Sequence, residues 1–457
     1  MRRVMNSKLR ILIFAILLLQ VTYPQITDLS EEWETNMSFE LADELENVVA
    51  TQIATLPNTL GFIVIHKGKI VSENYYGSDL ETSINIWSVT KSFISALVGQ
   101  AVDMGMINDP DSTASNFFPD YGIGYLDTLT LHNILTMSSG YADQFYPTDP
   151  FTFFFDPSQW WALNSTEILL SMPYAYPGEF YYNNSACHLN AHALFYGTDM
   201  TPSEFAGEYL FPHLGIDDPV WESGYLDIND GSAMLNLTLR EMVKLGQLYL
   251  QDGYSGETQI LSQEWIERST QSHVETGIDD EYGDLSDYGY LWWLIDDVGS
   301  VYTAQGLGGQ IIAVFPEYDL VIGAHSDVFG DDISDHSTVL NYRILEQIAP
   351  IFDDLASNKH HVTVPRKISL EQNYPNPFNS KTKIEYSLYE MTTVEITVYD
   401  IGGKLIKSLL SEVQSAGSKV ISWNGTNKFG EFVPSGTYFY RIEAGLHSQT
   451  RKMIIIK

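Results

Sequence analysis

The stretch INIWSVTKSFISALVGQAVDMG, residues 84–105, combines an apolar helical pattern with a single lysine near its start. Lys91 follows Ser88 by three residues, and residues three apart lie on the same face of a helix, so hydroxyl and amine can touch. A serine hydroxyl becomes a useful nucleophile once a base removes its proton, and a lysine can act as that base where burial lowers its pKa. The pattern predicts a Ser-Lys reaction centre on a buried helix.

Spacing alone does not settle this interpretation. Ser380 and Lys383 have the same separation in a segment that reads as a β-strand, where it carries no chemistry. The alternative at Lys91, a lysine that extends its amine from a helix start to solvent, is common on protein surfaces.

The segments around this helix predict a mixed α+β body. GFIVIHKGKIVSENYYG (61–77) is typical of two strands around a turn, and further strands are expected within 288–327. Helices are expected at 129–140, 238–253 and 336–352. Because strands lie at both ends of the body with helices between them, we expect an antiparallel sheet flanked by helices, with an additional helical region.

The composition changes near ASNKHHVTVPRK, residues 356–367, which we interpret as a linker. Beyond it, residues 368–457 show alternating strand patterns separated by glycine and asparagine turns, which predict a small all-β sandwich. The start, MRRVMNSKLRILIFAILLLQ, has a basic head and a short apolar stretch, as in a secretory signal peptide. We therefore expect a signal peptide at 1–27 and a body at 28–355, with an uncleaved N-terminal anchor as the alternative.

The body is strongly acidic. Residues 28–365 contain 51 acidic and 8 basic side chains, within a chain of net charge −35. Such a surface repels phosphate backbones, so we expect no nucleic-acid partner. The single cysteine, Cys187, excludes a disulfide within the chain and is expected to be a buried, inert thiol.

Five segments resemble, in the same order, motifs of the serine β-lactamase and penicillin-binding-protein superfamily, in the branch of class C β-lactamases, family VIII esterases and 6-aminohexanoate-dimer hydrolases. The segments are WSVTKSFISALVGQAVDMGMI (87–107), LTLHNILTMSSGY (129–141), PGEFYYNNSACHLNAHAL (177–194), GSAMLNLTLREMVKLGQLYL (231–250) and AQGLGGQIIAVFPEYDLVIGAH (304–325). The resemblance covers most of the body and implies a β-lactamase/transpeptidase-like domain.

The resemblance also implies residue roles. Ser88 would form an acyl-enzyme, with Lys91 and Tyr182 as general base and acid and Asn184 as a partner of Lys91 or the substrate. The backbone N–H groups of Ser88 and Leu307 would bind the oxyanion. The adjacent Tyr181 is the alternative to Tyr182. Residues expected at the substrate are Gln305, Gly306, Gly308, Trp160 and Trp161, of which the two tryptophans are equally expected as packed cover.

One departure from the family pattern bears on the substrate. The third family motif is commonly Lys-Thr-Gly or His-x-Gly, and here it reads Ala304-Gln305-Gly306. The missing cation weakens the case for β-lactams and peptidoglycan, so a small-molecule ester or amide is expected, with no metal or cofactor. The alternatives are a β-lactamase or D-Ala-D-Ala carboxypeptidase, and a catalytically inactive binding protein on the same fold.

The C-terminal region carries a second resemblance. LEQNYPNPFNSKTKIEYSL (370–388), VYDIGGKLIKSLL (398–410) and the terminal KMIIIK resemble a type IX secretion sorting domain. This resemblance implies that the type IX secretion machinery is a partner and that the protein is secreted or attached to the cell surface. An ordinary spacer or carbohydrate-binding sandwich is the alternative.

Overall fold

The computed structural model divides into two compact units, Met1–Asp353 and Asp354–Lys457, each of which is considered by itself. The predicted linker (356–367), most of the predicted signal peptide, Trp160 and Trp161 lie outside the described residues. The described residues are 26–118, 124–140, 178–223, 227–278, 285–295, 301–330, 333–352, 369–370, 372–388, 392–401, 403–414, 417–444 and 447–456.

An eight-stranded antiparallel sheet forms the centre of the first unit, in the order β2-β1-β12-β11-β10-β9-β8-β7. The N-terminal hairpin joins strands from the end of the body, because β1 pairs with β12. The strands are β1 (Thr59–His66), β2 (Lys69–Tyr75), β7 (Val274–Glu275), β8 (Asp287–Tyr288), β9 (Trp293–Ile295), β10 (Val301–Gly306), β11 (Gln310–Phe315) and β12 (Leu320–Ser326).

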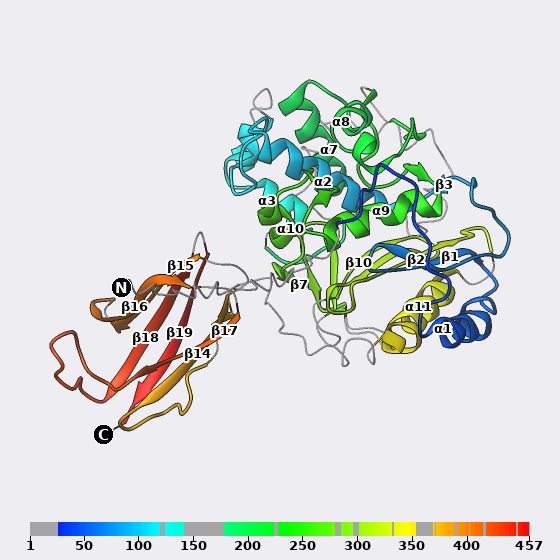
Figure 1. The fold of residues 1–457 in the computed structure, drawn as a ribbon. Coiled ribbons are helices and arrows are strands. Elements are labelled where there is room, and N and C mark those ends of the chain that lie inside the picture. Colours follow the sequence, from blue (N-terminus) through cyan, green and yellow to red (C-terminus); the bar gives the residue numbers. More distant parts are fainter. Residues whose placement is uncertain are drawn as a thin grey trace, which may run out of the picture. The chain divides into compact units, whose positions relative to one another are not determined.

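Helices cover both faces of this sheet (Figure 1). On one face α9 (Leu239–Leu250) packs on β11 and β12, and a capping box between Thr238 and Glu241 fixes its start. On the other face lie α1 (Ala42–Val48) and α11 (Ile333–Arg343). The short helices η1 (Val49–Ile53), η8 (Ile344–Ile348) and η9 (Ala349–Phe352) continue these two.

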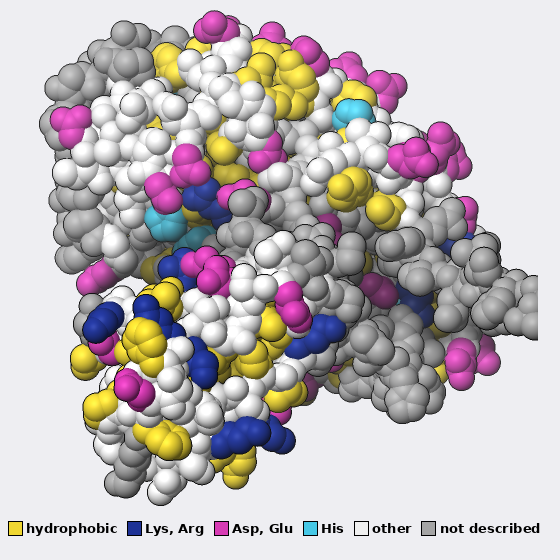
Figure 2. Space-filling view, turned by 60° about the vertical axis from the view of Figure 1, so that its left-hand side comes forward, with side chains coloured by type: hydrophobic (Ala, Val, Ile, Leu, Met, Phe, Trp, Pro, Cys, Tyr) yellow, Lys and Arg dark blue, Asp and Glu magenta, His cyan; other side chains and the backbone are white. Residues whose placement is uncertain are grey.

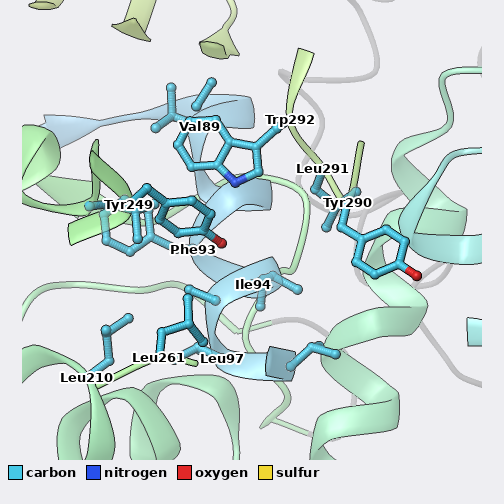
Figure 3. Close-up of a cluster of buried hydrophobic side chains, with 14 of the residues drawn as sticks. Val89, Phe93, Ile94, Leu97, Leu210, Tyr249, Leu261, Tyr290, Leu291 and Trp292 are labelled. Atoms are coloured by element: carbon cyan, nitrogen blue, oxygen red, sulfur yellow. The ribbon is translucent and has the colours of Figure 1, made fainter. Parts of the chain in front are cut away.

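The additional helical region lies beyond α9, on the same side of the sheet (Figure 1). Its helices are α2 (Thr90–Asp103), α3 (Leu131–Leu135), α7 (Asn184–Thr198), α8 (Pro202–Tyr209) and α10 (Gln263–Ser269). Every residue of α2 from Thr90 to Ala101 is buried, because α7, α8 and the sheet surround it. Figure 3 shows Phe93, Ile94 and Leu97 along α2, with Tyr249 and Trp292 packed beside them.

The second unit is an all-β sandwich. One sheet contains β13 (Ser369–Leu370), β14 (Thr382–Leu388) and β17 (Gly417–Trp423), and the other contains β16 (Leu405–Gln414), β15 (Thr392–Asp400), β18 (Gly436–Ala444) and β19 (His447–Ile455). Alternate residues of both sheets share one core, which includes Ile384, Trp423, Ile396 and Tyr440.

The architecture confirms the predicted fold class: an antiparallel sheet flanked by helices with a helical region, followed by a small sandwich. The helix predicted at 336–352 is less regular than expected, since α11 passes into π and 3-10 turns after Arg343. No helix within the described residues is long and apolar enough to cross a bilayer. Acidic side chains are spread over the face drawn in Figure 2, and hydrophobic side chains form small separate groups there.

The buried histidine of β12, His325, makes the free energy of unfolding depend on pH. Burial lowers the pKa of His325 to about 3, so its ring is neutral in the folded protein near neutral pH. The unfolded chain takes up a proton near pH 6.5, so the free energy of unfolding contributed here is complete above that pH and is lost as pH falls toward 3. We predict that His325→Leu flattens this dependence, as measured by urea unfolding at pH 7, 5 and 4. An unchanged slope would contradict the assignment.

Candidate active site

A short strand pair sets the position of Ser88. β3 (Ile84–Asn85) pairs with β4 (Asn236–Leu237), and the Asn85 side-chain carbonyl accepts hydrogen bonds from Trp87 N at 2.8 Å and Met234 N at 3.1 Å. Trp87 adopts a left-handed φ of 49°, a conformation that costs free energy for a side chain of this size. The chain therefore turns sharply into the 3-10 helix η2 (Trp87–Val89), which carries Ser88 to the start of α2.

The Lys91 amine is buried and held by three oxygen atoms. Its Nζ lies 2.8 Å from Ser88 Oγ, 2.7 Å from Asn184 Oδ1 and 2.9 Å from the backbone carbonyl oxygen of Ser232. Only 1% of the Lys91 residue is exposed, so it does not extend to solvent as a surface lysine would. The three partners come from η2, from α7 and from the loop before β4.

These contacts determine where a proton can move. The Asn184 and Ser232 oxygens can only accept hydrogen bonds, so each requires an N–H of Lys91. In its amine form Lys91 has two such hydrogens, and its lone pair is left facing Ser88 Oγ. The geometry thus suits removal of the Ser88 hydroxyl proton by Lys91.

The Ser232 carbonyl owes its position to a turn built on Asp230. The Asp230 carboxylate accepts hydrogen bonds from Ser232 N and Ser232 Oγ, both at 2.7 Å, and from Ala233 N at 2.9 Å. Trp221 Nε1 donates to the Asp230 carbonyl at 2.9 Å. Asp230 is 3% exposed, so a buried carboxylate and three local donors fix the loop that contacts Lys91.

Tyr182 lies next to Lys91, with its ring centroid 5.0 Å from Nζ. The ring stacks on Trp293 of β9 at a centroid distance of 5.4 Å and an interplanar angle of 17°. Phe180 and Tyr288 pack against the same indole. Tyr181 is 46% exposed, so of the two adjacent tyrosines it is Tyr182 that lies beside the lysine.

The end of β10 lies directly against the backbone of Ser88. A Cβ atom placed on Gly306 would be 2.5 Å from Ile86 O and 3.2 Å from Ser88 N, so no side chain fits there. Leu307 follows in the turn to β11, and Gln310 Nε2 donates to its carbonyl at 3.4 Å. The structure therefore brings the backbone at Gly306, the residue before Leu307, close to the amide of Ser88.

The other predicted substrate residues are placed differently. Gln305 lies on the sheet face toward α11, where its Oε1 accepts from Asn341 Nδ2 at 3.0 Å and its Nε2 donates to Thr303 Oγ1 at 2.9 Å. The structure thus separates Gln305 from Ser88, because neighbouring residues of a strand point to opposite faces. Gly308 is in the β10–β11 turn, with φ of 76° and no room for a Cβ beside Val328.

Sequence reasoning missed several residues that support the site. Asn85 and Asp230 are not part of a recognised motif, and Trp293 was assigned only to a strand. A sequence signal existed for Asp230 alone, since Asp-Gly-Ser is typical of a tight turn. The remaining contacts depend on tertiary packing.

Cys187 is buried, and burial raises the pKa of its thiol to about 12, as expected for an inert cysteine. Among the described residues, no group of three or more His, Cys, Asp or Glu side chains is arranged to hold a metal ion.

The fold and the contact between Ser88 and Lys91 are those of a serine hydrolase. Residues 54–341 match the Beta-lactamase family, which is more than half of the chain, and the protein belongs to that family. Residues 372–457 match the Secretion system C-terminal sorting domain. The protein is therefore exported, to the cell surface or the exterior.

Similar proteins include a 6-aminohexanoate-dimer hydrolase from Paenarthrobacter ureafaciens, which is 22% identical over 302 residues covering 60% of this chain and 76% of that protein. A solved structure from Bacillus anthracis, assigned to the same hydrolases, is 19% identical with a TM-score of 0.54, covering 73% of this chain and 89% of its own. One from Bacteroides dorei, assigned as a β-lactamase, is 16% identical with a TM-score of 0.57, covering 70% and 100%. These structures support the predicted β-lactamase/transpeptidase fold.

The contact between Gly306 and Ser88 gives a direct test of the site. We predict that Gly306→Ala lowers kcat about 100-fold, because the new methyl group clashes with Ile86 O and displaces the backbone that carries Ser88. The matched control is Gly207→Ala in α8, where a Cβ meets nothing within 4 Å. Steady-state kinetics and thermal unfolding of both variants make the measurement. Equal activity of the two would show that Gly306 does not border the reacting atoms.

Proposed function

We propose that this protein cleaves an ester or an unstrained amide through an acyl-enzyme on Ser88. The observation that carries the proposal is the contact of the buried Lys91 Nζ with Ser88 Oγ at 2.8 Å, while two acceptor oxygens engage the same amine. When Lys91 is in its neutral amine form and its two hydrogens go to Asn184 and Ser232, its lone pair is directed at the Ser88 hydroxyl.

Acylation follows from these positions. Ser88 Oγ attacks the carbonyl carbon while its proton passes to Lys91 Nζ, and the carbonyl π electrons move to the oxygen. The amides of Ser88 and Leu307 stabilise this oxyanion. As the tetrahedral intermediate collapses, the bond to the leaving group breaks, and Tyr182 protonates the departing oxygen or nitrogen. Tyr182 regains a proton from the Lys91 ammonium, which restores the amine.

Deacylation repeats the sequence with water as nucleophile. Tyr182 and Lys91 take a proton from the attacking water, and the Ser88–acyl bond breaks with return of a proton to Ser88 Oγ. Asn184 acts through Lys91, because its Oδ1 holds the amine in place throughout. All atoms of the reaction come from the substrate, water and these side chains.

The residue at position 304 favours a substrate without a carboxylate at that point of the cleft. Ala304 is 1% exposed and lies two residues before Gly306, on the same face of the strand. At this position the family commonly has a cationic or imidazole side chain. The acidic body acts in the same direction, since it repels anionic substrates at long range. A small neutral or cationic ester or amide fits these constraints.

A β-lactamase or D-Ala-D-Ala carboxypeptidase is the second candidate, because Ser88, Lys91 and Tyr182 are all present. A catalytically inactive binding protein is the third. The full chain is proposed to comprise a signal peptide (1–27), the hydrolase (28–355), a linker (356–367) and a sorting domain (368–457) that the type IX secretion machinery recognises.

We predict that the purified protein hydrolyses short-chain p-nitrophenyl esters and that Ser88→Ala lowers kcat/KM at least about 1,000-fold. Nitrocefin, tested in parallel, should not be hydrolysed. Turnover of nitrocefin that depends on Ser88 would instead place the protein with the β-lactamases. Absence of Ser88-dependent turnover of either substrate, with ligand binding retained in Ser88→Ala, would favour the binding protein.

The two adjacent tyrosines offer a matched pair of variants. We predict that Tyr182→Phe lowers kcat about 100-fold, because proton transfer to the leaving group loses its donor. Tyr181→Phe should stay within about twofold of the wild type, since that side chain is 46% exposed. Kinetics with an ester and with the corresponding anilide make the comparison, and the anilide, whose leaving group needs a proton most, should be affected more. A larger loss for Tyr181→Phe would reverse the assignment.

A further inference from the structure

One face of α7 contacts both Lys91 and the loop that positions the Ser232 carbonyl. Asn184, Cys187, His188, Ala191 and His192 recur at spacings of three and four, so they lie along a single face of this helix. Asn184 contacts Lys91, and His188 contacts the loop at Gly231. His192 lies one turn further along α7, against His188. Cys187, His188 and His192 are at most 1% exposed.

This face of α7 contacts both the amide and the carbonyl of Gly231. The Gly231 amide donates to His188 Nδ1 at 3.0 Å, and the Gly231 carbonyl oxygen lies 3.5 Å from Cys187 Sγ. A Cβ on Gly231 would be 2.9 Å from the Ala191 Cβ, so only glycine lets the loop come this close. The next residue, Ser232, presents its carbonyl oxygen to Lys91.

The hydrogen bond to Gly231 fixes the protonation state of His188. A backbone N–H can only donate, so Nδ1 of His188 must be unprotonated and the ring proton must lie on Nε2. That atom is 3.1 Å from Nε2 of His192, which therefore accepts. The two rings meet edge to face, with centroids 4.6 Å apart. Burial lowers the pKa of both histidines, in agreement with a neutral pair.

We propose that His188 and His192 are positioning residues for the Ser88–Lys91 pair. His192 selects the tautomer of His188, His188 holds Gly231, and the loop in turn holds the Ser232 carbonyl on Lys91. The inference rests on the proposed function. It adds a buried two-histidine relay, which no part of the Ser-Lys-Tyr pattern contains. Asp230 in the loop is the charged group that acts on His188, and Cys187 on the same face of α7 lies near both Asp230 and Lys91.

The relay can be tested with variants that differ in one acceptor atom. His188→Leu removes the acceptor for Gly231, whereas the side-chain oxygen of His188→Asn can take the place of Nδ1. With a short-chain p-nitrophenyl ester as probe, we expect His188→Leu to lower kcat roughly tenfold or more, with KM changed far less. His188→Asn should recover most of that loss. Equal kcat for the two variants, with unfolding temperatures matched, would overturn the proposal.

A second pair covers the case in which His188→Leu does not fold. His192→Leu removes the acceptor that selects the tautomer of His188, and His192→Gln keeps an acceptor nearby. We expect slower acylation of Ser88 by a fluorophosphonate in the first variant and near-normal acylation in the second. Equal rates in both would count against the relay.

The tautomer itself can be observed independently of turnover. Long-range ¹H–¹⁵N spectra of histidine-labelled protein, assigned by difference with His188→Asn, should show a neutral His188 ring protonated on Nε2 at pH 7. A charged ring, or one protonated on Nδ1, would overturn the inference whatever the enzyme hydrolyses. The wild-type protein could show the expected tautomer and yet no Ser88-dependent turnover. That result would contradict the proposed function but not the role of His188 in positioning the loop at Gly231.

Discussion

The contact of a buried lysine amine with three oxygen atoms is the constraint on which the rest of the site depends. An amine withdrawn from water costs several kcal/mol unless its hydrogens are satisfied. Here the oxygens of Asn184 and Ser232 accept the two hydrogens of the neutral amine, and the Ser88 hydroxyl faces its lone pair, so three separate segments surround it. The fold must therefore bring those segments together before the lysine can be buried, so that stability and chemistry share the same contacts.

A separate local interaction positions each of the three segments around the Lys91 amine. The turn at Trp87 is held by Asn85, the turn before β4 is held by the Asp230 carboxylate, and α7 presents Asn184 in its first turn. None of these interactions is itself reactive. Their combined effect is to fix the amine and the hydroxyl within hydrogen-bond distance, which removes the entropy cost of finding that geometry during the reaction.

The sequence predicted the fold class and the neighbours of Ser88 well, because both depend on local patterns. Helical spacing placed Ser88 and Lys91 on one face, where the two side chains are in contact. The family resemblance implied Gln305 at the substrate, whereas strand geometry directs its side chain toward Asn341, because neighbouring residues of a strand point to opposite faces. Trp293 and the histidines of α7 could not be assigned, since their roles arise from loops and strands distant in sequence.

The substitution of the family's cation by Ala304 changes how charge is balanced in the cleft. With Lys91 engaged by three oxygens, its charge in the ammonium form is already shared among close partners and contributes little attraction to a distant carboxylate. In the mechanism that we propose, stabilisation of developing negative charge then rests mainly on the backbone amides of Ser88 and Leu307, which act at short range on the oxyanion. On this proposal, the site distinguishes substrates by the reacting carbonyl and by their fit beside the stacked rings of Tyr182 and Trp293 more than by their net charge. That balance suits esters and amides lacking an anionic anchor, and it is consistent with an enzyme whose acidic surface would repel one.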